Sequence, residues 1–172
     1  MNGFTRGEFL GVIAILAIVA ILALYNFQVS AVKARDEQRK ANARTIVYAL
    51  ESYHKDFGKF PPSKDGKIFA CGTVQELKTC DWGVDKLTDT ADPSYPAYVD
   101  PIPYDPQQGQ GNSLFYLSNG SEFQIFGHLE RREDPEWSEY IASLGLTCGV
   151  RICNYGITLG TKPVGRILEV GQ

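Results

Sequence analysis

Aspartate side chains gather between residues 81 and 105, where their carboxylate oxygens could bind calcium. Their spacing does not follow the regular loop of an EF-hand, and an aspartate before a proline is also ordinary turn chemistry. A calcium site and solvated turns are therefore both open, and solvated turns are the preferred interpretation. The calcium candidates are Asp81, Asp85, Asp89 and Asp92, and Asp100 and Asp105 follow them.

The 4 cysteines occur as local pairs, one at residues 71 and 80 and one at residues 148 and 153. Zinc sites use close pairs of thiolate or imidazole ligands, whereas neither spacing is close and only His54 and His128 could add to them. Disulfides are the preferred interpretation for an exported domain, because they persist in oxidising compartments. Sequence alone leaves the alternative pairings open.

No motif in the sequence indicates catalysis or nucleic-acid recognition. The chain has no glycine-rich phosphate loop and no nucleophile elbow, and its 2 histidines do not accompany a cysteine at telling positions. It carries 17 Lys and Arg residues against 20 Asp and Glu residues, which gives a net charge of -3. We therefore expect no enzyme and no specific nucleic-acid partner.

An apolar segment near the N-terminus follows a single acid. Glu8 precedes an uncharged stretch from Phe9 to Val32, which as a helix of about 36 Å exceeds the roughly 30 Å hydrocarbon core of a membrane. A signal peptide has a basic start, a shorter apolar centre and a small-residue cleavage site, and none of these fits here. We expect a retained membrane-spanning helix, whose carboxylate at the entrance needs a compensating charge.

The residues Gly3, Phe4 and Glu8 resemble the class III signal of type IV prepilins and of type II secretion pseudopilins. In that superfamily a prepilin peptidase cuts after a Gly that precedes Phe, and the new amine is methylated. A Glu occupies the fifth mature position, which falls on Glu8. The resemblance implies cleavage between Gly3 and Phe4, and neutralisation of the Phe4 amine of the next subunit by Glu8. The alternative is a carboxylate in the headgroup zone that pairs with Arg6.

The same resemblance implies the disulfides Cys71–Cys80 and Cys148–Cys153, since pilins of this superfamily often staple a C-terminal loop in this way. It implies other copies of the chain, a prepilin peptidase, an assembly ATPase and a platform membrane protein as partners. The precursor would be a single-pass protein of the inner or cytoplasmic membrane, and the product an extracellular filament. Calcium, which major pseudopilins often hold in a loop, is the one cofactor the resemblance suggests.

The helix should continue beyond the apolar segment, because no Pro or Gly occurs between Val32 and Phe57. Asp36 and Lys40 have the spacing of a helical ion pair. We expect most of this charged stretch to lie at the surface. Its charged residues are Lys33, Arg35, Asp36, Glu37, Arg39, Lys40 and Arg44.

An apolar helix face follows the charged stretch and must pack on something. Gly58 then favours a helix end, and Pro61-Pro62 prevents continuation. The face consists of Ile46, Leu50, Tyr53 and Phe57.

The part from residue 58 to 172 has the length of one compact domain. Asn119-Gly120, between the runs 113–117 and 122–129, is the strongest hairpin signal, although Asn119-Gly120-Ser121 is also a glycosylation sequon. We expect loops at 71–80 and 93–106, and weaker strands at 155–159 and 166–170.

The sequence predicts an α+β fold, in which a long N-terminal helix, transmembrane in its first half, packs on a small antiparallel sheet. The expected organisation is a leader remnant at 1–3, a membrane or filament-core helix at 4–32, its amphipathic continuation at 33–57 and a pilin-like domain at 58–172. The implied function is polymerisation into a type IV pilus-like surface filament for adhesion, motility or uptake. The alternatives are a major pseudopilin in a periplasmic type II secretion pseudopilus, and a signal-anchored extracytoplasmic binding domain that does not polymerise.

Overall fold

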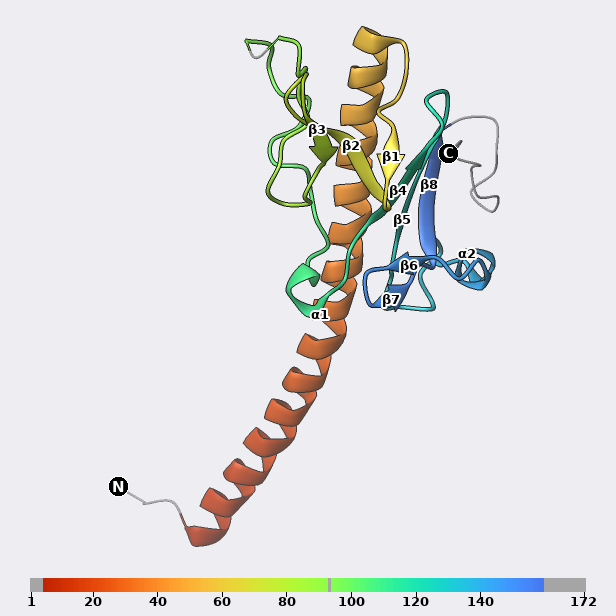
Figure 1. The fold of residues 1–172 in the computed structure, drawn as a ribbon. Helices are drawn as coiled ribbons and strands as arrows, with labels where there is room; N and C mark the ends of the chain where they lie inside the picture. Colours follow the sequence, from red (N-terminus) through yellow and green to blue (C-terminus); the bar gives the residue numbers. More distant parts are fainter. Residues whose placement is uncertain (1–4, 93, 160–172) are drawn as a thin grey trace. The chain divides into compact units, whose positions relative to one another are not determined.

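A computed structural model describes residues 5–92 and 94–159 of the chain (Figure 1). The chain divides into two compact units, one ending at Arg35 and the other beginning at Asp36. The fold is α+β, with one long N-terminal helix and small antiparallel sheets, as the sequence predicts. The elements are α1 (Arg6–Phe57), β1 (Ser63–Lys64), β2 (Lys67–Gly72), β3 (Leu77–Thr79), η1 (Gln108–Gln110), β4 (Phe115–Ser118), β5 (Phe123–Gly127), α2 (Glu139–Ser143), β6 (Thr147–Cys148), β7 (Arg151–Ile152) and β8 (Tyr155–Leu159).

Helix α1 ends where the sequence predicts. Gly58 adopts a φ of 67°, in the left-handed region that costs glycine little, and its N–H donates to the carbonyl of His54 at 2.8 Å. Pro61 and Pro62 follow and cannot continue the helix. The helix end therefore has a local cause in the sequence.

The predicted hairpin is present as β4 and β5, which pair antiparallel from Phe115↔Phe126 to Ser118↔Phe123. Gly120 has a φ of 88° in the connecting turn, and the Asn119 N–H donates to the carbonyl of Glu122 at 3.2 Å. Strand β8 pairs with the other edge of β5 and completes a 3-stranded sheet, so the strand predicted at 155–159 is confirmed. The strand predicted at 166–170 lies outside the described residues.

The loop predicted at 71–80 is wrong for half of its length. Strands β2 and β3 pair antiparallel there, and with β1 they form a second 3-stranded sheet. Cys71 lies in β2, Cys80 follows β3, and a disulfide joins them across the pair. Strand β2 carries three buried core residues, Ile68, Ala70 and the disulfide-bonded Cys71, and the alternate positions of Ile68 and Ala70 turn one side of its pleat toward the core.

A second disulfide, Cys148–Cys153, closes the hairpin of β6 and β7. Both disulfides are the local pairs that the resemblance implies. The described part of the proline-rich stretch 93–106 contains none of the strands β1 to β8, yet its Ile102 is fully buried. This stretch is therefore a loop that contributes to the core.

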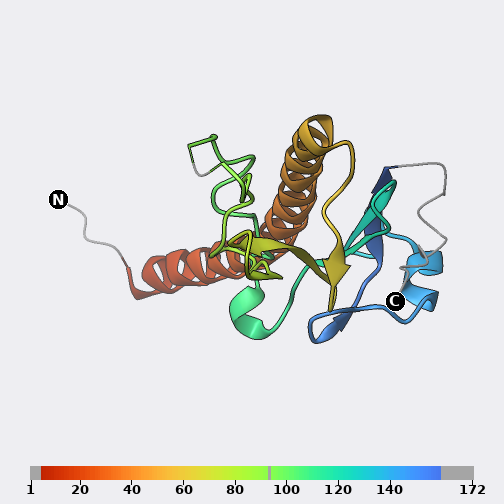
Figure 2. The same ribbon diagram turned by 45° about the horizontal axis from the view of Figure 1, so that its top comes forward.

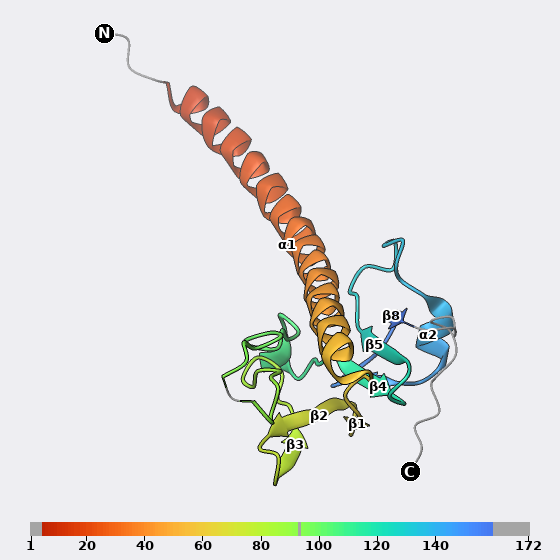
Figure 3. The same ribbon diagram turned by 90° about the horizontal axis from the view of Figure 1, so that it is seen from above.

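The core of the unit that begins at Asp36 forms between α1 and the sheets. Ile46 and Leu50 are fully buried in one apolar cluster with Ile68, Tyr116 and Phe123. Of the rest of the predicted face, Tyr53 is partly buried against this cluster, whereas Phe57 is 37% exposed, so the prediction is wrong for Phe57. Two views show this part of α1 with β3 to one side and α2 to the other (Figures 2 and 3). Small strands thus gain stability from a shared helix.

Replacing Leu50 with Ala should lower the free energy of unfolding by about 2 to 5 kcal/mol, because it removes buried methyl groups and leaves a cavity. Tyr48→Ala is the control on the same helix, since Tyr48 is 67% exposed, and it should change the value by only about 0.5 kcal/mol. Denaturant unfolding of the full chain, followed by tryptophan fluorescence, measures both. Equal effects of the two variants would contradict the packing described for α1.

Candidate functional site

The N-terminal part of α1 exposes an apolar surface on every side. We call this the apolar helix surface, and each of its large side chains is between 45% and 69% exposed. Among the described residues, α1 is the one helix long and apolar enough to cross a membrane. A helix that is apolar all round needs lipid or protein around it. The members are Phe9, Leu10, Val12, Ile13, Ile15, Leu16, Ile18, Val19, Ile21, Leu22, Leu24, Tyr25, Phe27 and Val29.

Glu8 lies in the first turn of α1 and forms a capping box with Thr5. The backbone N–H and the hydroxyl of Thr5 each donate to Glu8 Oε2 at 2.8 Å, and the Glu8 N–H donates to Thr5 Oγ1 at 3.4 Å. Glu8 and Arg6 form no ion pair in the described part of the chain, and side chains two apart on a helix do not face each other. The carboxylate is thus held at the N-terminal end of the apolar helix surface. Gly3 and Phe4, the predicted processing residues, lie outside the described residues.

The four calcium candidates have protein partners. Asp81 pairs with Lys67 at 2.7 Å, and Asp85 pairs with Lys78 at 3.1 Å. Asp89 accepts from the N–H of Ala91, and Asp92 accepts from the N–H of Ser94, both in turns. Within residues 5–92 and 94–159, no group of three or more His, Cys, Asp or Glu side chains could hold a metal ion. Calcium binding stays a prediction that the turn geometry does not require.

The prediction that the charged stretch of α1 lies mostly at the surface is wrong for three of its side chains. Asp36 and Arg39 are fully buried, and Lys40 is 5% exposed. They continue the stripe of Ile46 and Leu50 toward the N-terminus at helical spacing. The periodicity of the helix indicates their burial, whereas their charge alone indicates exposure. With Asp105, Glu130 and Asp134 they form what we call the ion cluster.

Arg39 lies at the centre of the ion cluster. Its Nε donates to Asp105 Oδ2 at 2.9 Å, and its Nη1 donates to Asp36 and to Glu130, each at 2.8 Å. Its Nη2 donates to Asp105 Oδ1 at 3.4 Å and to Gln107 Oε1. All N–H groups of the guanidinium therefore have oxygen partners, which offsets the cost of removing the charge from water.

The carboxylate of Asp36 joins α1 to a loop far away in sequence. It accepts from the backbone N–H of Glu130 at 2.9 Å and from that of Arg131 at 3.0 Å, besides the Arg39 guanidinium. The loop after β5 is thereby bonded directly to the helix. Backbone donors of this kind stabilise a buried carboxylate.

Lys40 and Asp134 form a second pair in the ion cluster, with Nζ and Oδ2 at 2.9 Å. Burial alone would lower the pKa of Lys40, but Asp134 and Glu37 raise it above its ordinary value. Burial would raise the pKa of Asp134, but the N–H of Glu136 and the Lys40 ammonium lower it. Both groups therefore stay charged, and the pair holds the loop before α2 against α1.

The two histidines lie in different surroundings. The ring of His54 packs on Phe60 with centroids 4.4 Å apart, and His128 Nδ1 lies 2.8 Å from the carbonyl oxygen of Ile152.

Asn119 of the sequon holds the hairpin turn, because its side-chain oxygen accepts from the N–H groups of Ser121 and Glu122. These residues have structural partners in the described part of the chain.

The chain thus combines an N-terminal apolar helix, compatible with a membrane anchor, and an α+β unit with two disulfides. A long apolar helix packed on a small antiparallel sheet is compatible with a pilin-like architecture. In comparisons with protein-family models, with curated proteins and with solved structures, the chain has no match.

Replacing Arg39 with Met should lower the free energy of unfolding by about 3 to 5 kcal/mol, because buried carboxylates lose their counter-charge. The matched control is Arg44→Met, which removes the same charge from an ion pair with Glu136 in which both side chains are at least 40% exposed. An exposed pair contributes about 0 to 1 kcal/mol. Denaturant unfolding at one ionic strength compares them, and a larger loss for Arg44→Met would refute the assignment of the ion cluster.

Proposed function

We propose that the chain is a structural subunit that polymerises through α1 into a type IV pilus-like surface filament. The observation that carries the proposal is the apolar helix surface with one carboxylate at its N-terminal end. Copies of the helix packed side by side would replace lipid contacts with protein contacts, while the α+β units lie on the outside. Before assembly the same surface would anchor the subunit in a membrane.

The chemistry of Glu8 supports an assembly role. Both capping hydrogen bonds from Thr5 go to Oε2, so Oε1 takes no part in the cap. Cleavage after Gly3 would give Phe4 a free amine, and the Phe4 amine of a neighbouring copy would supply the charge that a carboxylate needs in an apolar filament core. This pairing would fix the position of each subunit along the filament.

The disulfides support a location outside the cytoplasm, because they persist in oxidising compartments. In this proposal a prepilin peptidase processes the chain, and an assembly ATPase with a platform membrane protein drives polymerisation. A secretion pseudopilus is the second candidate. The two differ in where the filament lies, since a pilus extends from the cell surface and a pseudopilus stays in the periplasm.

Filaments sheared from the cell surface and pelleted should contain the chain with a methylated Phe4 as its first residue. The physical reason is that polymerisation requires the new amine at the end of the apolar helix. Mass spectrometry of the N-terminal peptide measures this. An intact Met1 confined to the membrane fraction, with no sheared material, would favour a solitary anchored domain instead.

Glu8→Gln should reduce the yield of sheared filaments to background while the chain still inserts into the membrane. A glutamine keeps the hydrogen-bond acceptor of the capping box but removes the charge that the Phe4 amine needs. Immunoblots of the sheared and membrane fractions give the two yields.

Thr5→Val serves as the matched control for Glu8→Gln. It removes the hydroxyl of the capping box and leaves the carboxylate charged, so filaments should persist. Normal filaments from Glu8→Gln together with their loss in Thr5→Val would show that the cap, and not the charge, is required.

A further inference from the structure

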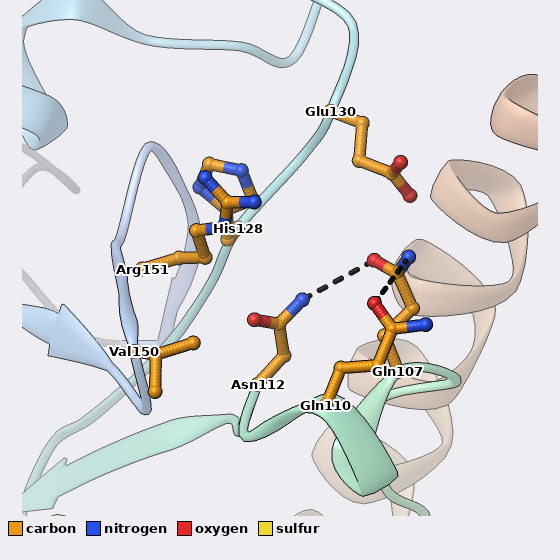
Figure 4. Close-up of a pocket in the computed structure, with 7 residues that line it drawn as sticks. All are labelled: Gln107, Gln110, Asn112, His128, Glu130, Val150 and Arg151. Atoms are coloured by element: carbon orange, nitrogen blue, oxygen red, sulfur yellow. Dashed lines mark hydrogen bonds between the residues drawn. The ribbon is translucent and has the colours of Figure 1, made fainter.

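A polar cavity of about 400 Å³ lies in the unit that begins at Asp36 (Figure 4). One wall comes from the segment around η1 and the other from the β6–β7 hairpin, and the strand end at His128 and Glu130 completes it. The volume falls within the range of small-molecule sites, about 300 to 1,000 Å³. The lining residues are Gln107, Gln110, Asn112, His128, Glu130, Val150 and Arg151.

The two walls are fixed to each other. The N–H of Val150 donates to the carbonyl of Gly111 at 3.0 Å, and the N–H of Ser113 donates to that of Cys148 at 3.1 Å. The disulfide Cys148–Cys153 closes the hairpin that carries Val150 and Arg151. The cavity is therefore formed before any ligand arrives, which lowers the entropic cost of binding.

Arg39 sets the orientation of the amide groups in the cavity. A guanidinium only donates, so the atom of Gln107 that it meets must be the oxygen. Gln107 Oε1 in turn accepts from Asn112 Nδ2 at 3.2 Å, which leaves the oxygen of Asn112 as its free end. Asn112 is 5% exposed, and Figure 4 shows its oxygen turned away from Gln107 toward the side of His128 and Arg151. The cavity thus contains an accessible acceptor with a fixed direction, on a side chain that is itself largely buried.

His128 adds a second acceptor. Its Nδ1 lies 2.8 Å from the carbonyl oxygen of Ile152, and because a carbonyl only accepts, Nδ1 carries the proton. With the proton on Nδ1, Nε2 is the ring nitrogen that can accept from a ligand when the imidazole is uncharged. Asn154, which also lies near the ring, donates its amide to the carbonyl of Leu129 at 2.9 Å.

Arg151 supplies a positively charged hydrogen-bond donor, in contrast to the acceptors on Asn112 and His128. Its side chain is exposed and lines the cavity, and within the described residues no hydrogen bond or ion pair of its guanidinium is found. Across the cavity, the carboxylate of Glu130 pairs with Arg39 at 2.8 Å but shares that one guanidinium with Asp36 and Asp105, so its charge is compensated only in part. A guanidinium without a carboxylate partner favours a carboxylate on the ligand.

We propose that this cavity binds the carboxylate-bearing residue of an acidic sugar. Its carboxylate pairs with Arg151, and its hydroxyl groups donate to the oxygen of Asn112 and to Nε2 of His128. The side chain of Val150 offers an apolar contact for the C–H face of the ring. A simple carboxylate would leave the two acceptors without donors, and a neutral sugar would leave Arg151 without a counter-charge.

The test uses the full chain in phosphatidylcholine nanodiscs, because many detergents carry sugar headgroups that would compete. Saturation-transfer NMR titrations compare glucuronate, galacturonate and N-acetylneuraminate with glucose, galactose and acetate. We expect at least one sugar acid to bind about tenfold more tightly than its neutral counterpart and than acetate. Binding of none of the acids, or equal binding of a neutral sugar or of acetate, would overturn the proposal.

Two variants assign the site. Arg151→Ala should weaken binding of the sugar acid by about tenfold. Its control is Arg132→Ala, which removes the same charge from a side chain that is 70% exposed outside the cavity and should leave binding unchanged. If both variants lose affinity for the sugar acid equally, the loss comes from the net charge of the protein and not from Arg151 in the cavity, and the site is refuted.

Asn112→Ala should also weaken binding, and Gln75→Ala, which removes an exposed amide elsewhere, should not. Because Asn112 is buried, its unfolding transition is measured beside the binding. A folded Asn112→Ala variant with full affinity would refute the role of this acceptor, while Arg151→Ala, at an exposed position, still tests the site.

Discussion

The packing of the unit that begins at Asp36 depends on one interaction, the hydrogen bonds that the buried guanidinium of Arg39 donates to oxygen atoms. The guanidinium of Arg39 cannot accept a hydrogen bond and keeps its charge at any ordinary pH, so its N–H groups must donate to oxygen atoms. Removing one partner of a buried ion pair lowers the free energy of unfolding by about 3 to 5 kcal/mol. The oxygens come from α1 itself, from the segment at residues 105–107 and from Glu130. Meeting this need draws two long loops against one helix. The same guanidinium orients Gln107 and, through it, Asn112.

The N-terminal part of α1 meets a different constraint. Its apolar side chains point outward on all sides, and none from Phe9 to Val29 is buried within the described chain. The free energy of such a surface in water is unfavourable by roughly 25 cal/mol for each Å² of apolar area. Lipid or protein around this surface would supply the contacts that the described residues do not. One continuous helix thus takes part in an internal core at one end and requires external partners at the other.

Local patterns in the sequence were sufficient for the helix, its end at Gly58, the β4–β5 hairpin and the apolar face of Ile46 and Leu50. These features depend on neighbouring residues, so composition and periodicity reveal them. The ion cluster was missed because Asp36 and Arg39 find partners 66 to 95 residues away, and local charge alone suggested solvent. Strand β2 was missed because its partner β3 is short and lacks an alternating pattern. The cavity was missed because its walls come together only in the fold.

The ion cluster also opposes a shift of α1 along its axis relative to the sheets. A shift by about one helical turn, roughly 3.6 residues, would bring Leu50 to the place of Ile46 but His54 to the fully buried place of Leu50. The same shift would bring Ala43 to the place of Arg39 and leave the buried carboxylate of Asp105 without a cation. The apolar face and the ions therefore both oppose the shift, and together they select a single docking register.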